Sequence, residues 1–583
     1  MTARGPVGDR PVTRCERFVP KRGARKTLSL GTPRFNPPEL AAVAANEGVE
    51  AAWQLAYARF GAHAPLHVDG DFAVALRDDD GRIFAAVDRF AVRPLCFRRE
   101  GDEIIVAERA DDAAAKTTGL QPQAIFDYLY FHVIPAPRTI FDDVIRLSGG
   151  TSITFFHGIV ETCRWWTPTF VERETRPFRE LRSEFRTILR ESVARQTGPG
   201  VTGCFLSGGT DSSTVAGMLR DVTGDAPNTF SIGFDAAGYD EMAYAKIAAR
   251  HFGARHHEYY VTPDDVVASL PKVAAFYDQP FGNSSVVPAY YCASMARNAG
   301  VSKILAGDGG DELFGGNTRY AKQRVFEIYE NVPQLLRKHV LERIFDERSA
   351  FGKLRPFSKA ASYIAQARTP LPDRMQMYNL LARVGHQEIF VPEFLSSVDV
   401  DDPARQQRVT FAGVDAASLV NRMLGFDWKY TLADNDLPKV VGATSLAGLP
   451  AGFPLLDARL VEFSLRLAPA LKLKRLTLRW FFKEALRGYL PDEILAKQKH
   501  GFGLPFGPWL VRGGALLDMA AASLDGLARR GIVRPEFLQR LIRDLLPSAP
   551  GYYGELVWIL MMLEQWWSRH DARAAQARRP APV

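Results

Sequence analysis

The segment Phe205-Leu-Ser-Gly-Gly-Thr-Asp-Ser-Ser213 decides the fold of this chain, because it joins an apolar, strand-like run to a stretch of helical character. Gly208 and Gly209 let the backbone turn close to an anion, and the helix that follows points its positive end at the same place. Three hydroxyl groups can add hydrogen-bond donors to this turn, those of Ser207, Ser212 and Ser213. The segment therefore has the features of a pyrophosphate cradle.

Asp211 is an unexpected residue for a plain anion site, because its carboxylate would repel phosphate groups. A carboxylate beside phosphates becomes favourable when Mg²⁺ bridges the two, so the segment indicates a nucleoside triphosphate with a metal. The Walker P-loop ends in Gly-Lys-Ser/Thr, and this segment lacks that ending. An ordinary Gly-Ser loop without a ligand is the alternative interpretation.

The pattern Ser-Gly-Gly-x-Asp-Ser-Ser resembles the PP-loop of the ATP pyrophosphatases, which cleave ATP between the α and β phosphates. A second segment, Lys303-Ile-Leu-Ala-Gly-Asp-Gly-Gly-Asp-Glu-Leu-Phe-Gly-Gly316, resembles a block found in asparagine synthetases. Two such blocks in this order are more specific than either alone. The chain is therefore similar to the glutamine-hydrolysing asparagine synthetase family, strongly over residues 201–320 and patchily elsewhere.

This resemblance implies ATP and Mg²⁺ as cofactors and gives roles to residues of both blocks. Asp211 and Asp311 would be the Mg²⁺ ligands, one from each block, with the pyrophosphate held between them. Leu206 and Ile232 would line the adenine pocket, and Gly307 would let the nucleotide approach the backbone. The nucleotide-binding set implied in this way is Leu206, Ser207, Gly208, Gly209, Asp211, Ser212, Ser213, Ile232 and Gly307.

Two catalytic residues follow from the same comparison. Asp308 matches the position where asparagine synthetases carry a glutamate and β-lactam-forming relatives a tyrosine, and a carboxylate there can accept a proton from an attacking amine. Its alternative role is to cap the turn at 312–315. Lys499 resembles the family lysine that reaches the α-phosphate and the developing oxyanion, where acyl transfer concentrates negative charge. Lys497 is instead predicted to be a solvated helix lysine.

Composition and charge fit a large enzyme that binds neither a membrane nor a nucleic acid. The 583 residues suffice for two or three domains, and no apolar stretch reaches the roughly 18 residues that span a bilayer. The longest candidate, Leu556 to Leu563, is predicted to be a buried helix. The formal charge of +7 comes from basic residues near both ends, which favours solvated tails. Five cysteines lack CxxC spacing, which argues against a zinc site and indicates a cytoplasmic, reducing setting.

Three regions separate along the chain, and together they predict an α/β protein. Residues 28–170 read as short strands with Gly and Asp turns. Residues 171–570 begin with alternating strands and helices, which predicts a doubly wound parallel sheet, and become mostly helical beyond about residue 321. Residues 1–27 are expected to form a disordered basic tail and residues 571–583 a flexible one. The parallel strands are expected at Val201 to Leu206, Thr229 to Phe234, His257 to Val261 and Lys303 to Ala306.

The first region resembles the glutamine amidotransferase domain of asparagine synthetases, an αββα N-terminal-nucleophile fold. The resemblance lies in residues 70–78 and 87–95, with 82–87 as the hairpin partner of the preceding strand. The family nucleophile is a cysteine exposed at the mature N-terminus, but no cysteine follows Met here, and Cys15 lies in a basic run without the family's strand after it. The family segment Asn-Gly-Glu-Ile-Tyr-Asn has no counterpart between residues 28 and 67. We therefore predict a retained scaffold without glutaminase activity; the alternatives are cleavage that exposes Cys15 and a misassigned start of the chain.

Four charges of the family's acceptor region are missing from this chain. In the ungapped comparison, Val441, Gly442, Pro450 and Gly452 replace Asp, Arg, Glu and Arg. The acceptor pocket should therefore be smaller or differently shaped, which weakens the case for plain aspartate as the substrate. The segment Asp278 to Ser285 likewise departs from the more acidic form of its relatives.

These observations predict an AMP-forming amide ligase of the asparagine synthetase type. It would adenylate an aspartate-like carboxylate, on a small molecule or a peptide, and transfer it to ammonia or an amine with release of AMP and pyrophosphate. Three alternatives stay open: glutamine-hydrolysing asparagine synthesis, intramolecular lactam or macrocycle formation, and a non-catalytic interaction protein. Asp211, Asp311 and Lys499 argue against the last. A homodimer is compatible with this assignment.

Overall fold

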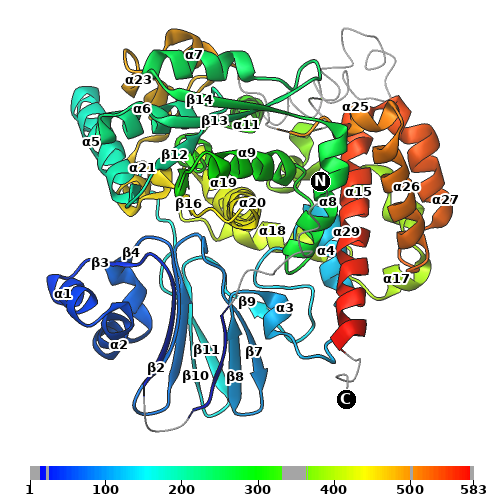
Figure 1. The fold of residues 1–583 in the computed structure, drawn as a ribbon, viewed down its shortest axis with the longest axis horizontal. Coiled ribbons are helices and arrows are strands. Elements are labelled where there is room, and N and C mark those ends of the chain that lie inside the picture. Colours follow the sequence, from blue (N-terminus) through cyan, green and yellow to red (C-terminus); the bar gives the residue numbers. More distant parts are fainter. Residues whose placement is uncertain (1–13, 21–24, 331–362, 364–365, 499–502, 578–583) are drawn as a thin grey trace, which may run out of the picture.

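The computed structural model describes residues 14–20, 25–330, 363, 366–498 and 503–577. Figure 1 shows an N-terminal part built on two antiparallel sheets, which lies against a larger part built on a parallel sheet and many helices. Within the described ranges, every helix is too short or too polar to cross a lipid bilayer.

Two antiparallel sheets form the middle of the N-terminal part. One has the strand order β11-β10-β6-β5-β2 and the other β1-β8-β7-β9. The predicted hairpin is confirmed as β5 and β6, with Ala73 opposite Val87 and Arg77 opposite Ile83. The strands are β1 (Cys15–Phe18), β2 (Lys26–Gly31), β3 (Arg34–Phe35), β4 (Val68–Asp69), β5 (Phe72–Arg77), β6 (Ile83–Val87), β7 (Cys96–Glu100), β8 (Glu103–Ala107), β9 (Ile145–Arg146), β10 (Thr151–Phe156) and β11 (Ile159–Arg164).

The two sheets pack face to face and helices cover their outer faces, so the predicted αββα layering is confirmed. Apolar side chains that include Phe18, Ile104 and Phe155 fill the space between the sheets. On the first sheet, Trp53 of α2 packs against Phe72 with ring centroids 5.1 Å apart. On the second sheet lie α3 and α4, and α4 also packs against the C-terminal helix. These helices are α1 (Pro38–Asn46), α2 (Val49–Phe60), η1 (Gly61–His67), α3 (Ala110–Ala113) and α4 (Pro122–Phe131).

For residues 14–20 and 25–27, the described part of the range 1–27, the structure corrects the prediction of a disordered tail. Cys15–Phe18 is strand β1, which pairs antiparallel with β8, and β2 also begins inside this region. Its basic side chains are not simply solvated, because Arg17 pairs with Glu103 across the strands while Phe18 is fully buried. Strand pairing, a cross-strand ion pair and the burial of Phe18 therefore order a segment whose composition suggested a solvated tail.

The larger part contains a parallel sheet with the order β14-β13-β12-β15-β16, as the doubly wound pattern predicted. The order reverses between β12 and β15, and in such sheets ligands bind outside the carboxyl ends of the strands at that point. Both Gly-rich segments directly follow these two strands. The fifth strand, β16, was not predicted, because two residues are too few for an alternating pattern. The strands are β12 (Thr202–Phe205), β13 (Asn228–Phe234), β14 (Arg255–Val261), β15 (Lys303–Leu305) and β16 (Ala451–Gly452).

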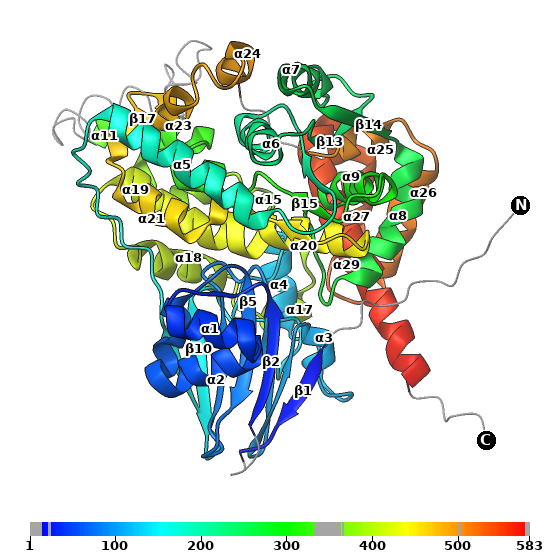
Figure 2. The same ribbon diagram turned by 60° about the vertical axis from the view of Figure 1, so that its left-hand side comes forward.

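Helices cover both faces of the parallel sheet (Figure 2). One apolar cluster contains buried residues of α5, α6 and α7, and another contains those of α8 and α9. The first helices of this part are α5 (Phe178–Gln196), α6 (Thr210–Thr223), α7 (Met242–Phe252), α8 (Pro263–Phe276), α9 (Val286–Asn298), α10 (Gly310–Phe314) and α11 (Thr318–Glu330).

The remainder of the described chain is mostly helical, in agreement with the prediction for residues beyond about 321. A short hairpin, β17 (Leu473–Lys474) and β18 (Thr477–Leu478), interrupts it. The first helical segments are η3 (Asp373–Gln376), α15 (Leu380–Val384), α16 (His386–Ile389), α17 (Pro392–Ser396), α18 (Asp402–Ala412), α19 (Leu419–Asp427), η4 (Trp428–Asp436) and α20 (Leu437–Leu446). The later ones are η5 (Pro454–Leu456), α21 (Ala458–Arg466), α22 (Pro469–Lys472), α23 (Trp480–Ala485), α24 (Asp492–Ala496), α25 (Phe506–Val511), α26 (Ala515–Ala528), α27 (Pro535–Arg540), η6 (Leu541–Leu545), α28 (Leu546–Ser548) and α29 (Pro550–Ala577).

The C-terminal helix α29 confirms one prediction and corrects another. Residues 556–563 are buried within it, as expected. The flexible tail predicted from residue 571 is helical as far as Ala577, because this end still packs beside α8. There the Arg573 guanidinium donates to the carbonyl oxygen of Ala275 at 2.6 Å.

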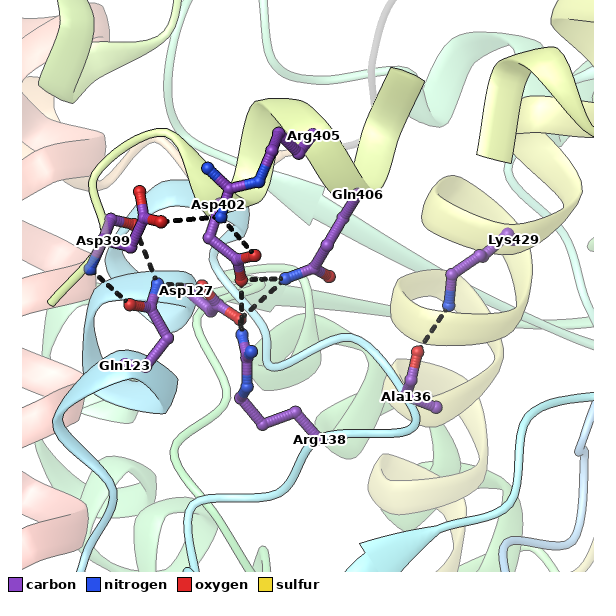
Figure 3. Close-up of polar contacts among 9 residues, drawn as sticks. All are labelled: Gln123, Asp127, Ala136, Arg138, Asp399, Asp402, Arg405, Gln406 and Lys429. Atoms are coloured by element: carbon purple, nitrogen blue, oxygen red, sulfur yellow. Dashed lines mark hydrogen bonds and ion pairs between the residues drawn. The ribbon is translucent and has the colours of Figure 1, made fainter. Parts of the chain in front are cut away.

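A polar network joins α4 of the N-terminal part to α18 of the larger part (Figure 3). Asp127 is fully buried and pairs with Arg138, whose Nη1 also donates to Asp402 Oδ2 at 3.0 Å. The Gln406 amide donates to Asp127 at 3.3 Å and to Asp402 at 2.8 Å. Burial raises the pKa of Asp127, and the opposing charge of Arg138 limits that rise. Because each buried charge has a partner, this network holds the two parts in a defined orientation.

A second buried carboxylate, that of Asp278, fixes another point of the same interface. Its Oδ2 accepts hydrogen bonds from Arg146 Nη2 at 2.6 Å and from the Ala110 amide at 2.7 Å, both in the N-terminal part. Nearby, Arg109 Nη1 donates to the carbonyl oxygen of Phe276 at 2.6 Å. The start of the divergent segment 278–285 therefore binds the N-terminal part.

Candidate active site

The nucleotide-binding turn predicted from sequence lies between β12 and α6, at the carboxyl edge of the parallel sheet. Gly208 has a φ of +67°, and a Cβ there would lie 2.4 Å from the backbone carbonyl carbon of Tyr244, so no other residue fits. Ser212 Oγ accepts a hydrogen bond from the Ser207 amide at 3.1 Å. The Gly209 amide donates to Ser207 Oγ at 3.3 Å. The turn is thus tightened by its own serines.

The other predicted nucleotide-binding residues lie on or beside the same edge. Leu206 directly follows β12 and is buried, and its amide donates to Phe230 of the neighbouring strand at 2.9 Å. Ile232 lies two residues further along that strand. Ser213 is fully buried in α6, and among the described residues its hydroxyl has no hydrogen-bond partner. The contacts of these side chains with a nucleotide stay a prediction.

Glycines of the second block let it touch the first. A Cβ on Gly307 would lie 2.9 Å from the Ser212 amide nitrogen, and one on Gly310 would lie 2.1 Å from Asp211 Oδ1. The sequence assigned Gly307 to making room for the nucleotide. In the structure, the backbone and side chain of the first block occupy the space where a Cβ would project.

Asp211 and Asp311, the predicted metal ligands, are brought together and share one cation. Arg479 Nη1 donates to Asp211 Oδ2 and to Asp311 Oδ1, each at 2.8 Å, and Nη2 also contacts Asp211 Oδ1. The Arg479 side chain is only 7% exposed. Burial alone would lower the pKa of Arg479, but the two carboxylates outweigh it and raise that pKa, so the guanidinium stays charged.

Arg479 was not identified from the sequence. It follows the β17–β18 hairpin and precedes α23, with a φ of +55° that is uncommon for a residue with a side chain. Its distance of 268 positions from Asp211 leaves no local signal. Single arginines often precede helices, so this position alone does not indicate a functional residue.

Asp308 lies beside these carboxylates and contacts a lysine that the sequence did not single out. Lys439 Nζ is 3.6 Å from Asp308 Oδ1 and 2.9 Å from Asp436 Oδ1. Burial, reinforced by Asp436 and Asp211, raises the pKa of Asp308 to about 6, while Lys439 opposes the rise. The alternative role as a cap is not supported, because Gly309 precedes α10 and no side chain caps that helix. Asp308 is therefore suited to exchange a proton near neutral pH.

The structure corrects the interpretation of Lys497 as a solvated lysine. Its side chain is 7% exposed, with Nζ 3.0 Å from Glu241 Oε1 and 3.4 Å from the Ser207 carbonyl oxygen. Burial lowers the pKa of Lys497, although Glu241 opposes this. A cation thus lies under the nucleotide-binding turn. Lys499, the catalytic lysine predicted from the family, lies outside the described residues.

Tyr277 explains one of the missing charges in the acceptor region. A Cβ on Gly442 would lie 2.2 Å from Tyr277 Oη, so a larger residue at 442 would displace this ring. The hydroxyl donates to the Pro438 carbonyl oxygen at 3.2 Å, and the ring stacks on Phe281 at 4.5 Å between centroids. An aromatic ring fills the space in which the family's arginine would begin, one turn after Lys439.

In the amidotransferase-like part, two groups bear on the question of glutaminase activity, the Asp71 carboxylate and the Cys15 thiol. Asp71 accepts hydrogen bonds from the Thr32 hydroxyl and, at 2.8 Å, from Arg93 Nε. Cys15 is the first residue of β1. Burial is the largest cause that raises the pKa of its thiol, and the charge of Asp112 is the next. A raised pKa disfavours the thiolate that a nucleophile needs.

The donor set at Asp211 and Asp311 fits a divalent metal, because these carboxylates already converge on a cation. Carboxylate oxygens are preferred ligands of Mg²⁺, which commonly combines one or two of them with substrate phosphates. In the part of the chain that the structure describes, no group of three His, Cys, Asp or Glu side chains could hold a metal. A metal at this position would therefore be held jointly with a nucleotide.

Comparison with known proteins agrees with this geometry. The profile of the family described as asparagine synthase matches residues 184–568, which is more than half of the chain. The chain belongs to the asparagine synthase family. Residues 52–166 match the profile of the glutamine amidotransferase domain. As a family member, the protein is an ATP-dependent ligase of the asparagine synthetase type, acting on a carboxylate and an amine or ammonia donor.

Several relatives align over most of this asparagine synthase family member. A putative glutamine-hydrolysing asparagine synthetase of Mycobacterium tuberculosis is 27% identical over 556 residues, which cover 90% of this chain and 80% of the relative. Glutamine-hydrolysing asparagine synthetase 1 of Bacillus subtilis is 25% identical over 464 residues, covering 78% and 71%. An amidase of Penicillium rubens is 22% identical over 502 residues, covering 78% and 72%.

Proposed function

We propose that this protein converts a carboxylate substrate to its acyl-adenylate and then transfers the acyl group to ammonia or an amine, releasing pyrophosphate and AMP. The observation that carries the proposal is the meeting of three carboxylates at the switch point of the parallel sheet. Asp211 and Asp311 converge on one cation, and Asp308 lies beside them with a pKa of about 6. The first two suit a metal-bound polyphosphate and the third suits proton transfer.

In the first step, the substrate carboxylate attacks the α-phosphorus of ATP, and the bond to pyrophosphate breaks. Backbone amides of the turn at 207–209 and the N-terminus of α6 would bind the polyphosphate. Asp211 and Asp311 would hold Mg²⁺, which when bound neutralises charge on the leaving pyrophosphate.

In the second step, the amine attacks the acyl carbon and AMP departs. Asp308 would accept the proton that the amine nitrogen loses, and Lys439, held by Asp436, would keep that carboxylate ionised and in place. Lys499 stays our candidate for stabilising the oxyanion and the departing AMP. Lys497 would act as a second cation under the turn.

The acceptor region supports an aspartate-like carboxylate other than free aspartate. Where the family has an arginine, this chain has Gly442, and the Tyr277 ring fills the space beside the helix that carries Lys439. Such a wall would bind the less polar part of a small molecule or peptide better than the ionic groups of an amino acid.

ATP should be consumed to AMP and pyrophosphate in amounts equal to the amide formed. The reason is that a metal held by both proposed ligands would bind the β and γ phosphates, which would leave the α-phosphorus to the substrate. The products can be identified by ³¹P NMR with a panel of carboxylates in the presence of ammonium and Mg²⁺. Release of ADP and inorganic phosphate would refute the assignment.

Glutamine-dependent synthesis is the second candidate, favoured by the relatives that are named glutamine-hydrolysing. Against it, the Asn-Gly-Glu-Ile-Tyr-Asn segment has no counterpart, and burial and Asp112 raise the pKa of Cys15. We therefore propose that the N-terminal part is a scaffold. It would serve to brace the larger part through Asp127 and Asp278.

Glutamine should not serve as the nitrogen source. Ammonium chloride should support product formation, whereas glutamate release from glutamine should stay at the background rate, because the only thiol near the N-terminus of the described chain is disfavoured as a thiolate. Glutamate is measured beside AMP in the same assay for the unmodified protein, Cys15→Ala and the control Cys163→Ala. Glutamate release that matches AMP formation and disappears only in Cys15→Ala would show that the first domain is an active glutaminase.

We also propose a cytoplasmic location. The cysteines are all free, and Cys96, Cys204 and Cys292 are buried as unpaired thiols. Unpaired thiols persist in reducing compartments, which supports this proposal.

A further inference from the structure

Arg479 is a residue of the site that the proposed reaction does not use. Its guanidinium contacts both side-chain oxygens of Asp211 and one of Asp311. Among the described residues its Nε has no hydrogen-bond partner, and the hydrogen bonds from Nη1 and Nη2 go to these two carboxylates. Arg479 therefore engages three of the four oxygens on which a metal at this position would depend.

The surroundings are shaped for a guanidinium at this position. The Phe482 ring lies 4.3 Å from Arg479 Cζ and supports its face. A Cβ on Gly316 would lie 2.7 Å from Arg479 Cδ and 1.6 Å from Asp311 Oδ1, so glycine is needed for both side chains to pass. The positive φ of Arg479 adds backbone strain that the surrounding contacts must offset. The contacts that offset this backbone strain therefore hold Arg479 in a defined position.

A metal and this guanidinium would compete for the same carboxylate oxygens. Mg²⁺ binds carboxylate oxygens at about 2.0–2.1 Å and needs a near-octahedral shell. The lone pairs in question are engaged by Arg479, and two cations this close repel each other strongly in a buried site. Binding of one cation at these carboxylates should therefore weaken binding of the other.

We propose that Arg479 is the resident counter-cation of the metal site, bound to Asp211 and Asp311 when no nucleotide is present and competing with divalent metal for them. The metal then binds well only together with a polyphosphate. The negative charge of the polyphosphate attracts the metal, and its oxygens serve as further ligands. Metal without nucleotide is held weakly. This inference rests on the metal role given to the two carboxylates in the proposed function.

The test is the affinity for Mn²⁺ without nucleotide, measured from the EPR signal of the free ion with the full-length protein. Arg479→Met should bind Mn²⁺ about tenfold or more tightly than the unmodified protein, the usual range for removing a coupled competitor. Arg479→Lys should lie between the two, because a point charge engages the carboxylates less fully than a guanidinium. Both variants keep a β-carbon at the strained position, so strain does not distinguish them from the parent.

Lys483→Met is the matched control. This lysine lies one turn further along α23 and interacts electrostatically with both Arg479 and Asp311, but its replacement leaves the Arg479 contacts in place. A gain in affinity as large in Lys483→Met as in Arg479→Met would mean that only net charge matters, which overturns the inference. So would an unchanged affinity in Arg479→Met.

Thermal unfolding provides a second measurement that does not depend on activity. In EDTA, Arg479→Met should melt at a lower temperature than the parent because two partly buried carboxylates lose their shared partner, and added Mg²⁺ should restore it more than it stabilises the parent. If Mn²⁺ binding to Arg479→Met persists when Asp311→Asn is added, the carboxylates are not the metal ligands, and the metal part of the proposed function fails as well. If Asp311→Asn removes the binding but Arg479→Met shows no gain, only the counter-cation inference fails.

Discussion

Replacing Asp211 with asparagine is expected to lower ATP turnover by roughly a hundredfold to a thousandfold, the usual cost of losing one electrostatic group that acts in the transition state. Asparagine keeps the shape but loses the charge that would hold Mg²⁺ on the polyphosphate. The fold should survive, because Asp311 still accepts a hydrogen bond from Arg479 at 2.8 Å and neutralises it. Pyrophosphate release gives the rate, and circular dichroism with thermal unfolding checks the fold.

Asp221→Asn is the matched control for this change. Asp221 lies in the same helix, α6, but at its exposed C-terminal end, where it accepts a hydrogen bond from the Tyr489 hydroxyl at 2.8 Å. Its replacement should leave turnover within a fewfold of the parent. If Asp211→Asn retains near-parental turnover in saturating Mg²⁺ and ATP, then the first block does not supply a metal ligand, and the proposed adenylation site is wrong.

The turn at residues 207–209 and the sheet that carries it could be predicted because their signals are local. A strand, two glycines and the beginning of a helix lie within a few residues of one another. This combination predicts both the turn and the positive end of the helix that faces it. The same reasoning at residues 303–316 placed the second block at the neighbouring strand. Two blocks on strands that flank the switch point necessarily meet, so the approach of Asp211 to Asp311 follows from topology.

The partners of these carboxylates could not be predicted in this way. Arg479 and Lys497 come from the helical region far along the chain, and nothing in their own neighbours shows that they reach Asp211 and Ser207. Lys439 lies in the segment that resembles the family's acceptor region. That segment differs from the family by four missing charges, and nothing in it indicates that Lys439 contacts Asp308. Side-chain contacts over such separations depend on the packing of the whole domain.

The N-terminal strand β1 shows the limit of composition as a guide. The basic residues around Cys15 suggested a solvated tail, yet Arg17 pairs with Glu103 and Glu100, and Lys26 pairs with Glu16. The apolar anchor of this strand is the single residue Phe18. One apolar residue in a run of charged residues does not make the alternating pattern that predicts a strand. It is enough to anchor the strand once the segment can pair with an existing sheet.

Asp308→Asn is expected to slow amide formation by about a hundredfold or more, the usual contribution of a general base. Adenylation should be affected far less, because the carboxylate acts on the amine and not on the phosphates. Exchange of labelled pyrophosphate into ATP reports adenylation alone, and amide formation reports both steps. If Asp308→Asn abolishes the exchange to the same degree as the overall reaction, this residue serves the nucleotide and not the amine.

The pH dependence of the amine step separates a base from a merely structural carboxylate. Asp308 must be ionised to accept a proton, so the rate should rise with pH through about 6, where its raised pKa lies. Lys439 lowers that pKa by its charge, so Lys439→Met should raise the pKa of Asp308 further and move the rising limb to higher pH. Lys439→Arg keeps the charge and should leave the limb near its original position. An unshifted limb in Lys439→Met, with a correctly folded protein, would show that the titrating group in the rate is not Asp308.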